Sequence, residues 1–369
     1  IWVQSKQMSV LKKEAIQRIY ETQGMESRMN LANQRNSSLN LLDGATGEAN
    51  ATILEVERQQ QLSSNPELPL DERLEAFEDI FESEVGDTSL VRARNIEREV
   101  GLRQIYLKFE GGNPTGTQKD RIAFAQAMDA MRRGFDTINV ATCGNYGVAM
   151  ALAAKFAGLH TRIHIPEKYH TRRIQEMKVL GAEIVRVAGD YEQAVITSSE
   201  EAHQHEYYDA NPGGDNLLMQ MQAYGQIAYE IYDELRDAPS VLAVPVSNGT
   251  TLAGVYKGFV SLYRRGKTSR IPRIVAGSSF RKNPIVHAFR HNKISCEDLN
   301  PGRIHETSIN EPLINWHAID GDHALEAIRH TDGWAADASD RAMRNTSRLI
   351  REKEGLQILP ASSAGLIAL

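Results

Sequence analysis

The spacing of hydrophobic positions divides the chain into two regions. Residues 1–85 are polar and favour helix, with a proline-containing break at 66–69. After the break a short amphipathic helix is predicted to open at Asp71. Its hydrophobic face carries Leu74, Phe77, Ile80 and Phe81. We interpret residues 1–85 as a helical N-terminal extension without readable chemistry.

From about Arg103 onward, short β-rich runs alternate with longer helical patterns. The runs are 105–109, 137–141, 161–165, 184–187, 241–246 and 274–276. Three helix-to-strand junctions carry a glycine where a left-handed residue commonly ends a helix, at Gly134, Gly158 and Gly181. This alternation predicts an α/β fold with mostly parallel sheets. Ligands of such sheets bind at the carboxyl ends of the strands, so we expect chemistry in the loops after Phe109, Ala141 and Val246.

Composition narrows the classes of protein. At ~150 residues per domain, 369 residues predict about two domains. The net charge is -6, and neither a Lys/Arg-rich block nor a run of ~20 apolar residues occurs, so nucleic acid and membrane are not expected partners. The chain begins at Ile1 and stops at Leu369 inside an apolar run. We therefore expect further residues at both ends, and a processed targeting segment stays open.

Cysteine and histidine usage gives no sign of a disulfide or metal framework. The two cysteines, Cys143 and Cys296, lie far apart in the sequence, which fits a reducing cytoplasm. Two histidine pairs occur, but no carboxylate or cysteine completes a ligand set at readable spacing. The pairs are His160 with His164 and His203 with His205. No metal site is predicted.

The first of the three loops, residues 110–121, delivers Lys119 to the start of a long predicted helix. The positive end of a helix favours a neutral amine, and a neutral amine attacks an aldehyde to form a Schiff base. A surface lysine in the first turn of an ordinary helix gives the same pattern. The loop alone leaves both interpretations open.

The second loop, residues 142–147, turns tightly into an alanine-rich helix. Its small residues allow backbone N–H groups to approach a carboxylate, and the Asn145 amide can donate to a phenolate oxygen. Close packing of strand and helix explains the glycines equally well. Cys143 is more typical of a small buried residue than of a nucleophile.

The third loop, residues 247–251, also opens a helix and reads Ser-Asn-Gly-Thr-Thr. Successive N–H groups at the helix start, together with the hydroxyls of Ser247, Thr250 and Thr251, would hold a phosphate. The glycine spacing matches neither the P-loop nor the dinucleotide fingerprint. An ordinary glycine-rich turn is the alternative.

Taken together and in this order, the loops and the closing segment 359–365 resemble the fold-type II pyridoxal-phosphate (PLP) enzymes, the superfamily of tryptophan synthase β and threonine synthase. Threonine synthase looks nearest. Segment 108–121 is similar to that family's cofactor-lysine segment, and 86–91 looks like its first strand. The resemblance runs from about residue 86 to the end, more loosely from 303, and leaves residues 1–85 uncovered.

The resemblance implies a role for each matching position. Lys119 would hold the cofactor as an imine and act as the catalytic base, and Asn145 would contact its phenolic oxygen. Ser362 would meet the pyridine nitrogen, and a neutral hydroxyl there leaves that nitrogen largely unprotonated. The phosphate would be bound by Ser247, Asn248, Gly249, Thr250 and Thr251. The substrate carboxylate would be held by Thr142, Cys143 and Gly144.

The sequence departs from the family pattern at three places. Tyr146 stands where relatives commonly have Thr or His, so it either reshapes the substrate side of the pocket or packs structurally. No Arg follows Asn211-Pro212, and a bidentate Arg contact is among the stronger ways to bind a phosphate. O-phosphohomoserine is therefore a doubtful substrate. Leu359 replaces the usual Glu before Pro360.

These observations predict an amino-acid lyase or synthase that performs β- or γ-elimination or replacement, related to threonine synthase with an altered substrate pocket. The alternatives are a true threonine synthase acting on O-phosphohomoserine and a non-catalytic PLP-binding regulatory protein. Two three-layer α/β domains are expected: 86–121 with 222–369 as the large PLP-binding domain, and 122–221 as the smaller one. The resemblance also implies a homodimer.

Overall fold

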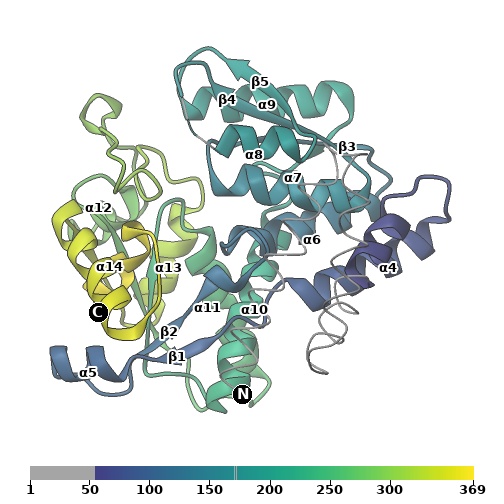
Figure 1. Ribbon diagram of the computed structural model, residues 1–369. Coiled ribbons are helices and arrows are strands. Elements are labelled where there is room, and N and C mark those ends of the chain that lie inside the picture. Colours follow the sequence, from purple (N-terminus) through teal and green to yellow (C-terminus); the bar gives the residue numbers. More distant parts are fainter. Residues whose placement is uncertain (1–54, 170, 172) are drawn as a thin grey trace. The chain divides into compact units, whose positions relative to one another are not determined.

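The computed structural model describes residues 55–169, 171 and 173–369 (Figure 1). The part of the predicted extension before residue 55 lies outside this range. The chain forms two compact units. The first contains the described residues up to Gly86 and 110–211, and the second contains 87–109 and 212–369. Residues 110–121 thus group with the first unit by their contacts, whereas the predicted domain boundaries group them with 222–369; the domain boundaries stay a prediction.

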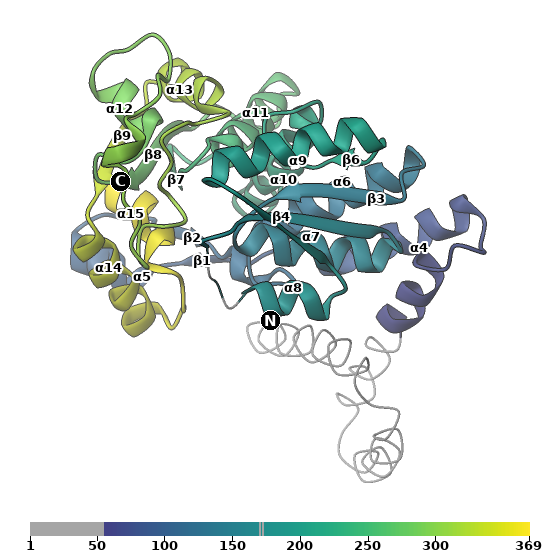
Figure 2. The ribbon, with the colours of Figure 1, turned by 90° about the horizontal axis from the view of Figure 1, so that it is seen from above.

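The first unit is built on a four-stranded parallel sheet, as the alternating pattern predicted. Its strands are β3 (Thr137–Ala141), β4 (His160–Pro166), β5 (Glu183–Val187) and β6 (Tyr208–Asp209), in the order β5-β4-β3-β6. Its helices are α6 (Lys119–Arg132), α7 (Asn145–Ala157), α8 (Arg173–Val179) and α9 (Tyr191–His205). Figure 2 shows α7 and α9 on opposite faces of the sheet. Every residue of β3 is buried, including the polar Thr137 and Asn139, and the Asn139 amide donates to the Ser198 carbonyl at 2.7 Å.

The predicted junction glycines are confirmed. Gly134, Gly158 and Gly181 have φ angles of 77°, 67° and 93°. These lie in the left-handed region, where a residue without Cβ carries no steric penalty. Each glycine therefore ends a helix and turns the chain into the next strand.

The described part of the N-terminal extension packs on the first unit. It is helical at 55–63 and in α4 (Leu70–Glu84), one residue earlier than predicted. The buried Ser63 hydroxyl donates to the Phe156 carbonyl at 2.6 Å, and Arg73 Nη2 donates to the Ala157 carbonyl at 2.9 Å. Phe77 stacks on Phe124 with ring centroids 5.7 Å apart. The extension thus provides donors for carbonyls that end α7 and have no partner within that helix.

The second unit contains a three-stranded parallel sheet in the order β7-β8-β9. The strands are β7 (Val241–Pro245), β8 (Arg273–Ser279) and β9 (Trp334–Ala338). Helices α11 (Thr250–Arg264), α12 (Pro284–Arg290) and α13 (Gly321–His330) enclose a core with this sheet, and α10 (Leu217–Leu235) packs on α11. Helix α15 (Ala364–Ala368) contacts all three strands, and α14 (Asp340–Glu354) packs nearby. A Cβ at Gly277 would lie 2.0 Å from the Ala364 carbonyl oxygen, so α15 needs glycine there to lie against β8.

The sequence pattern predicted the wrong pairing for one strand and did not predict two others. The run 105–109 was expected to continue the parallel series, but β2 (Tyr106–Lys108) pairs antiparallel with β1 (Leu90–Arg92) in a separate two-stranded sheet around α5 (Arg94–Val100). Strand β6 has only two residues, and β9 reads Trp-Ala-Ala-Asp-Ala without a β-branched residue. Strand β6 is too short to be recognised, and β9 has a single strand-favouring residue, Trp334, followed by Ala and Asp, which are depleted in strands.

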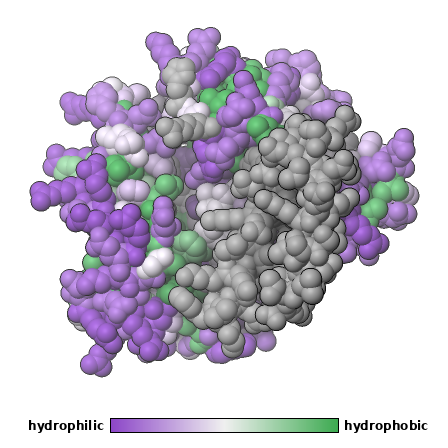
Figure 3. Space-filling model, in the orientation of Figure 1, coloured by the Kyte–Doolittle hydropathy of each residue, from purple (hydrophilic) through white to green (hydrophobic). Residues whose placement is uncertain are grey.

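The surface gives no sign of a membrane segment among the described residues. None of the described helices combines the length and hydrophobicity that crossing a bilayer requires. On the face drawn in Figure 3, hydrophilic side chains predominate among the described residues.

Candidate active site

Lys119 is the first residue of α6 and lies half-buried in the first unit. Its Nζ is 5.7 Å from the centroid of the Tyr146 ring, within the range of a cation–π contact. The helix predicted to begin at Lys119 therefore begins there. The lysine amine faces the Tyr146 ring, an aromatic side chain from the second loop.

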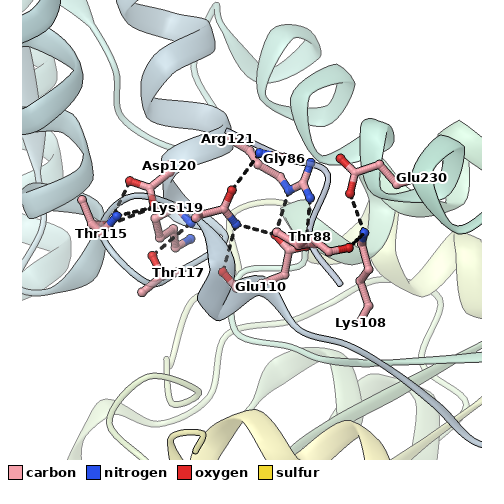
Figure 4. A network of polar contacts seen from close by, with 11 residues as sticks. Gly86, Thr88, Lys108, Glu110, Thr115, Thr117, Lys119, Asp120, Arg121 and Glu230 are labelled. Carbon is pink, nitrogen blue, oxygen red and sulfur yellow. Dashed lines mark hydrogen bonds and ion pairs between the residues drawn. The ribbon is translucent and has the colours of Figure 1, made fainter. Parts of the chain in front are cut away.

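The two charged residues after Lys119 hold the preceding loop in place (Figure 4). The Asp120 carboxylate is fully buried and accepts hydrogen bonds from the Thr115 N–H at 3.0 Å and the Thr115 hydroxyl at 2.9 Å. Arg121 donates twice to Glu110, from Nε at 2.7 Å and from Nη2 at 2.9 Å. Such a bidentate pair is geometrically specific. Asp120 and Arg121 together fix the backbone from which Lys119 projects.

Among the residues of this site, Asp120 has the most strongly shifted pKa. Burial raises the pKa of its carboxyl from 3.8 to about 7, although the hydrogen bonds from Thr115 oppose this shift. Between about pH 4 and pH 7 the folded protein therefore holds a proton on Asp120 that the unfolded chain has released. The resulting stabilisation is complete below pH 3.8 and is lost as the pH rises to about 7.

Replacing Asp120 by Asn is expected to flatten this pH dependence. Between pH 4.5 and 7.5 the wild type should lose roughly 3 kcal/mol more of its free energy of unfolding than Asp120→Asn does. Urea unfolding of both proteins at the two pH values measures the difference. Equal losses in both proteins would show that Asp120 does not hold this proton.

Asn145 begins α7, with Gly144 as its N-cap. Its side-chain oxygen accepts hydrogen bonds from Arg173 Nε at 3.2 Å and Nη2 at 2.9 Å. Thr142 is buried beside this turn, and its hydroxyl accepts from the Gly144 N–H at 3.5 Å. Cys143 is half-buried and forms no disulfide. The structure thus gathers Lys119 and the second loop in one unit, together with an arginine that the sequence did not single out.

Tyr146 is anchored through its hydroxyl. The residue is 6% exposed, and its hydroxyl accepts from Gln126 Nε2 at 2.5 Å and donates to the Ala210 carbonyl at 2.8 Å. The hydroxyl therefore has a packing role, one of the two alternatives left open for this residue. A substrate contact by the Tyr146 ring, which faces Lys119, stays a prediction.

The third loop, in the second unit, follows β7 and leads into α11 with Gly249 as the N-cap. Its carbonyls face inward: Ser247 O accepts from Asn283 Nδ2 at 3.0 Å, and Asn248 O accepts from the Asp320 N–H at 3.1 Å. Gly249 has a φ of 100°, and a Cβ there would lie 2.8 Å from the Asp320 carbonyl oxygen. The first N–H groups of α11 have no partner within the helix, so this loop is suited to bind an anion.

Asp320 is a further residue that the sequence did not reveal. It is buried at the N-cap of α13, and its carboxylate accepts a hydrogen bond from the Thr250 hydroxyl. The hydroxyl of Thr250 is thus used within the protein, and its backbone N–H is the donor that it can offer to a phosphate. The only sequence signal was an acidic residue before Gly321 at a helix start, 70 residues away from the loop.

Ser362 lies in a short 3-10 helix, Pro360–Ser363, and is exposed, whereas Ser363 is buried and donates to the Met343 and Pro360 carbonyls. Of the two adjacent serines, Ser362 is thus the one with an accessible hydroxyl. This is the serine that the resemblance assigned to the pyridine nitrogen.

Each unit, taken by itself, carries donors that suit a part of one kind of ligand. An aldehyde can be taken by the lysine amine, a phosphate by the N–H groups at the start of α11, and a phenolic oxygen by the Asn145 amide. Gly249 lets the backbone at the start of α11 lie against Asp320 and Ala324, and this packing fixes the N–H groups that a phosphate would meet. The residues present therefore fit PLP.

The comparisons with known proteins agree. The family described as "Pyridoxal-phosphate dependent enzyme" matches residues 81–369, so the chain belongs to this family and its cofactor is PLP. Threonine synthase of Methanocaldococcus jannaschii is 28% identical over 286 residues, which are 77% of this chain and 69% of that protein.

Two solved structures show the same fold. Maize serine racemase has a TM-score of 0.66 at 18% identity and covers 80% of this chain and 84% of its own. A fungal L-serine ammonia-lyase from Rhizomucor miehei has a TM-score of 0.64 at 20% identity and covers 76% of this chain and 85% of its own. At these identities the likeness concerns the fold alone.

Proposed function

We propose that this enzyme is a PLP-dependent lyase or synthase that performs β- or γ-elimination or replacement on an amino acid, with Lys119 as the base. The observation that carries the proposal is the placement of Lys119 at the first residue of α6, on a backbone fixed by the buried Asp120 and Arg121. The threonine synthase relative supports the reaction class.

Each residue set has a separate task in this proposal. Residues 247–251 bind the cofactor phosphate, with backbone N–H groups at the start of α11 among the donors. Asn145 donates to the phenolic oxygen of PLP, and Ser362 meets its pyridine nitrogen. When bound, PLP supplies an electron sink for the negative charge left on the substrate's Cα. Lys119 Nζ removes the α-proton and later returns a proton to the product or leaving group. Thr142, Cys143 and Gly144 hold the substrate carboxylate.

The structure around Asn211 bears on the substrate. Asn211 is buried, its oxygen accepts from the Ala141 N–H at 2.7 Å, and its amide donates to Asp209 at 2.6 Å. This asparagine therefore supports the start of the second loop, and no arginine follows Pro212. We infer a substrate whose leaving group does not require a dianion site. O-phosphohomoserine is the second candidate, favoured by the threonine synthase relative.

A panel of amino acids tests these assignments. L-serine, L-threonine and the O-acetyl and O-phospho derivatives of serine and homoserine are added to the PLP-loaded enzyme, and the visible spectrum, the released leaving group and the keto acid are measured. Leaving-group release supports the proposal. Threonine formed from O-phosphohomoserine would establish the second candidate. Interconversion of enantiomers without elimination would make the enzyme a racemase, and a spectrum that no amino acid perturbs would indicate a non-catalytic PLP protein.

The assembly and location stay proposals. We expect a homodimer, because the family resemblance implies one, and a cytoplasmic enzyme, because both cysteines are free thiols. Light scattering of the purified protein tests the first expectation.

A further inference from the structure

The side-chain oxygen of Asn145 receives two hydrogen bonds from one guanidinium, that of Arg173. A guanidinium has five donor hydrogens and no acceptor, so the Asn145 atom that faces it must be the oxygen. The Asn145 amide nitrogen is thereby turned away from Arg173. Arg173 thus fixes the orientation of the Asn145 amide group. Without such a partner, the side chain of an asparagine can adopt either of its two flipped orientations.

Arg173 is itself held in place. Its Nη1 donates to Glu176 at 2.5 Å, and its backbone N–H donates to the Thr171 hydroxyl at 3.2 Å. Its side chain is 27% exposed, so the guanidinium is only partly screened by solvent. All three guanidinium nitrogens therefore have a partner within the first unit. A side chain fixed in this way can orient a neighbour without a further loss of conformational entropy.

The charge of Arg173 reaches a second residue of the site. It lowers the pKa of the Asp120 carboxyl, the residue next to Lys119, against the larger effect of burial. A cation on the oxygen of an amide also polarises that amide, and hydrogen bonds in such a chain strengthen one another. The Asn145 N–H should thus be a stronger donor than that of an isolated asparagine.

We propose that Arg173 is a positioning residue that orients and strengthens the Asn145 amide as donor to the phenolic oxygen of PLP. The inference rests on the proposed function, in which Asn145 contacts that oxygen. Arg173 contacts neither cofactor nor substrate in this role and acts only through Asn145. Its loss should therefore matter only while Asn145 is present, and this dependence separates positioning from a general contribution to folding.

The test is a double-mutant cycle on PLP binding. Arg173→Gln and Asn145→Ala are prepared singly and together, and the PLP dissociation constant is measured by titration of the visible band. Arg173→Gln is expected to weaken binding about tenfold in the wild-type background, the difference between a charge-assisted and an ordinary hydrogen bond. In the Asn145→Ala background it should have less than about a twofold effect, because the residue through which it acts is absent.

A second readout follows the electronic effect. A weaker donor leaves the phenolic oxygen more basic, so any pH-dependent change of the visible band should move upward by about one pH unit in Arg173→Gln. Arg173→Lys keeps the charge but loses the paired donors, and is expected to fall between wild type and Arg173→Gln. Circular dichroism checks folding. If Arg173→Gln does not fold, the cycle is completed with Arg173→Lys.

The matched control is Arg186→Gln. Arg186 belongs to the same unit and donates to the carbonyls of Pro166 and Tyr169, so its loss removes comparable hydrogen bonds elsewhere. It should leave the PLP dissociation constant unchanged. Equal losses for Arg173→Gln with and without Asn145, or no loss at all, would overturn the inference. A wild type that binds no PLP would instead refute the proposed function, so the two failures are distinguishable.

Discussion

Replacing Lys119 by Ala is expected to slow turnover of the amino-acid substrate by at least about a thousandfold, because general acid–base catalysis by a positioned side chain contributes on this scale. The variant also loses the covalent attachment of PLP. Folding should be retained, because Asp120 and Arg121, which hold the loop, are untouched. The measurement is the release of leaving group from whichever amino acid the wild type consumes, together with PLP retention on gel filtration.

The control for this variant is Lys168→Ala, which removes an exposed lysine from the same unit. It should retain wild-type turnover. Added methylamine provides a second check, since a small free amine can partly replace the missing base but cannot repair a folding defect. Turnover of Lys119→Ala within tenfold of wild type would exclude Lys119 as the base.

Gly249→Ala should weaken PLP binding by at least about tenfold and destabilise the protein by about 1–3 kcal/mol, the range for one residue forced into an unfavourable backbone conformation. Gly249 has a φ of 100°, and the added Cβ would lie 2.8 Å from the Asp320 carbonyl oxygen and 2.9 Å from the Ala324 Cβ. The first N–H groups of α11 would be displaced with it. Urea unfolding and PLP titration measure the two effects separately.

Gly266→Ala is the matched control at the other end of the same helix. Gly266 also has a positive φ, of 66°, but a Cβ added there would meet no described atom within 4 Å. It should lower stability alone and leave the affinity for PLP unchanged. If Gly249→Ala binds PLP as tightly as wild type, residues 247–251 are not the phosphate site.

The sequence predicted the parts of the fold that local chemistry determines. The buried strand β3 and the glycines 134, 158 and 181 were recognisable because a short β-rich run and a left-handed helix end each leave a local signal. The antiparallel pairing of β2 with β1 was not, because pairing direction depends on the partner and not on the run itself. Strand β9 was not recognisable either, because Trp334 is its only strand-favouring residue.

The residues of the candidate site likewise fall into those with a local sequence signal and those without one. Lys119, Asn145 and Gly249 stood out because each follows a strand and opens a helix, a pattern visible within a dozen residues. Arg173 lies 28 residues from Asn145, and Asp320 lies 70 residues from Thr250. Their roles come from tertiary contacts between residues far apart in the sequence, and no local sequence pattern indicates such contacts. The burial that raises the pKa of Asp120 is likewise a property of the folded chain.

Reduction of the PLP-loaded enzyme with borohydride tests the central claim most directly. The protein is loaded with one equivalent of PLP, reduced, digested, and the modified lysine is located by mass spectrometry. We predict a single modified residue, Lys119. Lys155 is a competing candidate because burial lowers the pKa of its amine, and it should stay unmodified. Lys108, which pairs with Glu230 at 2.5 Å, should stay unmodified as well. Modification of either, or of no lysine, would contradict the assignment of Lys119 as the residue that holds the cofactor.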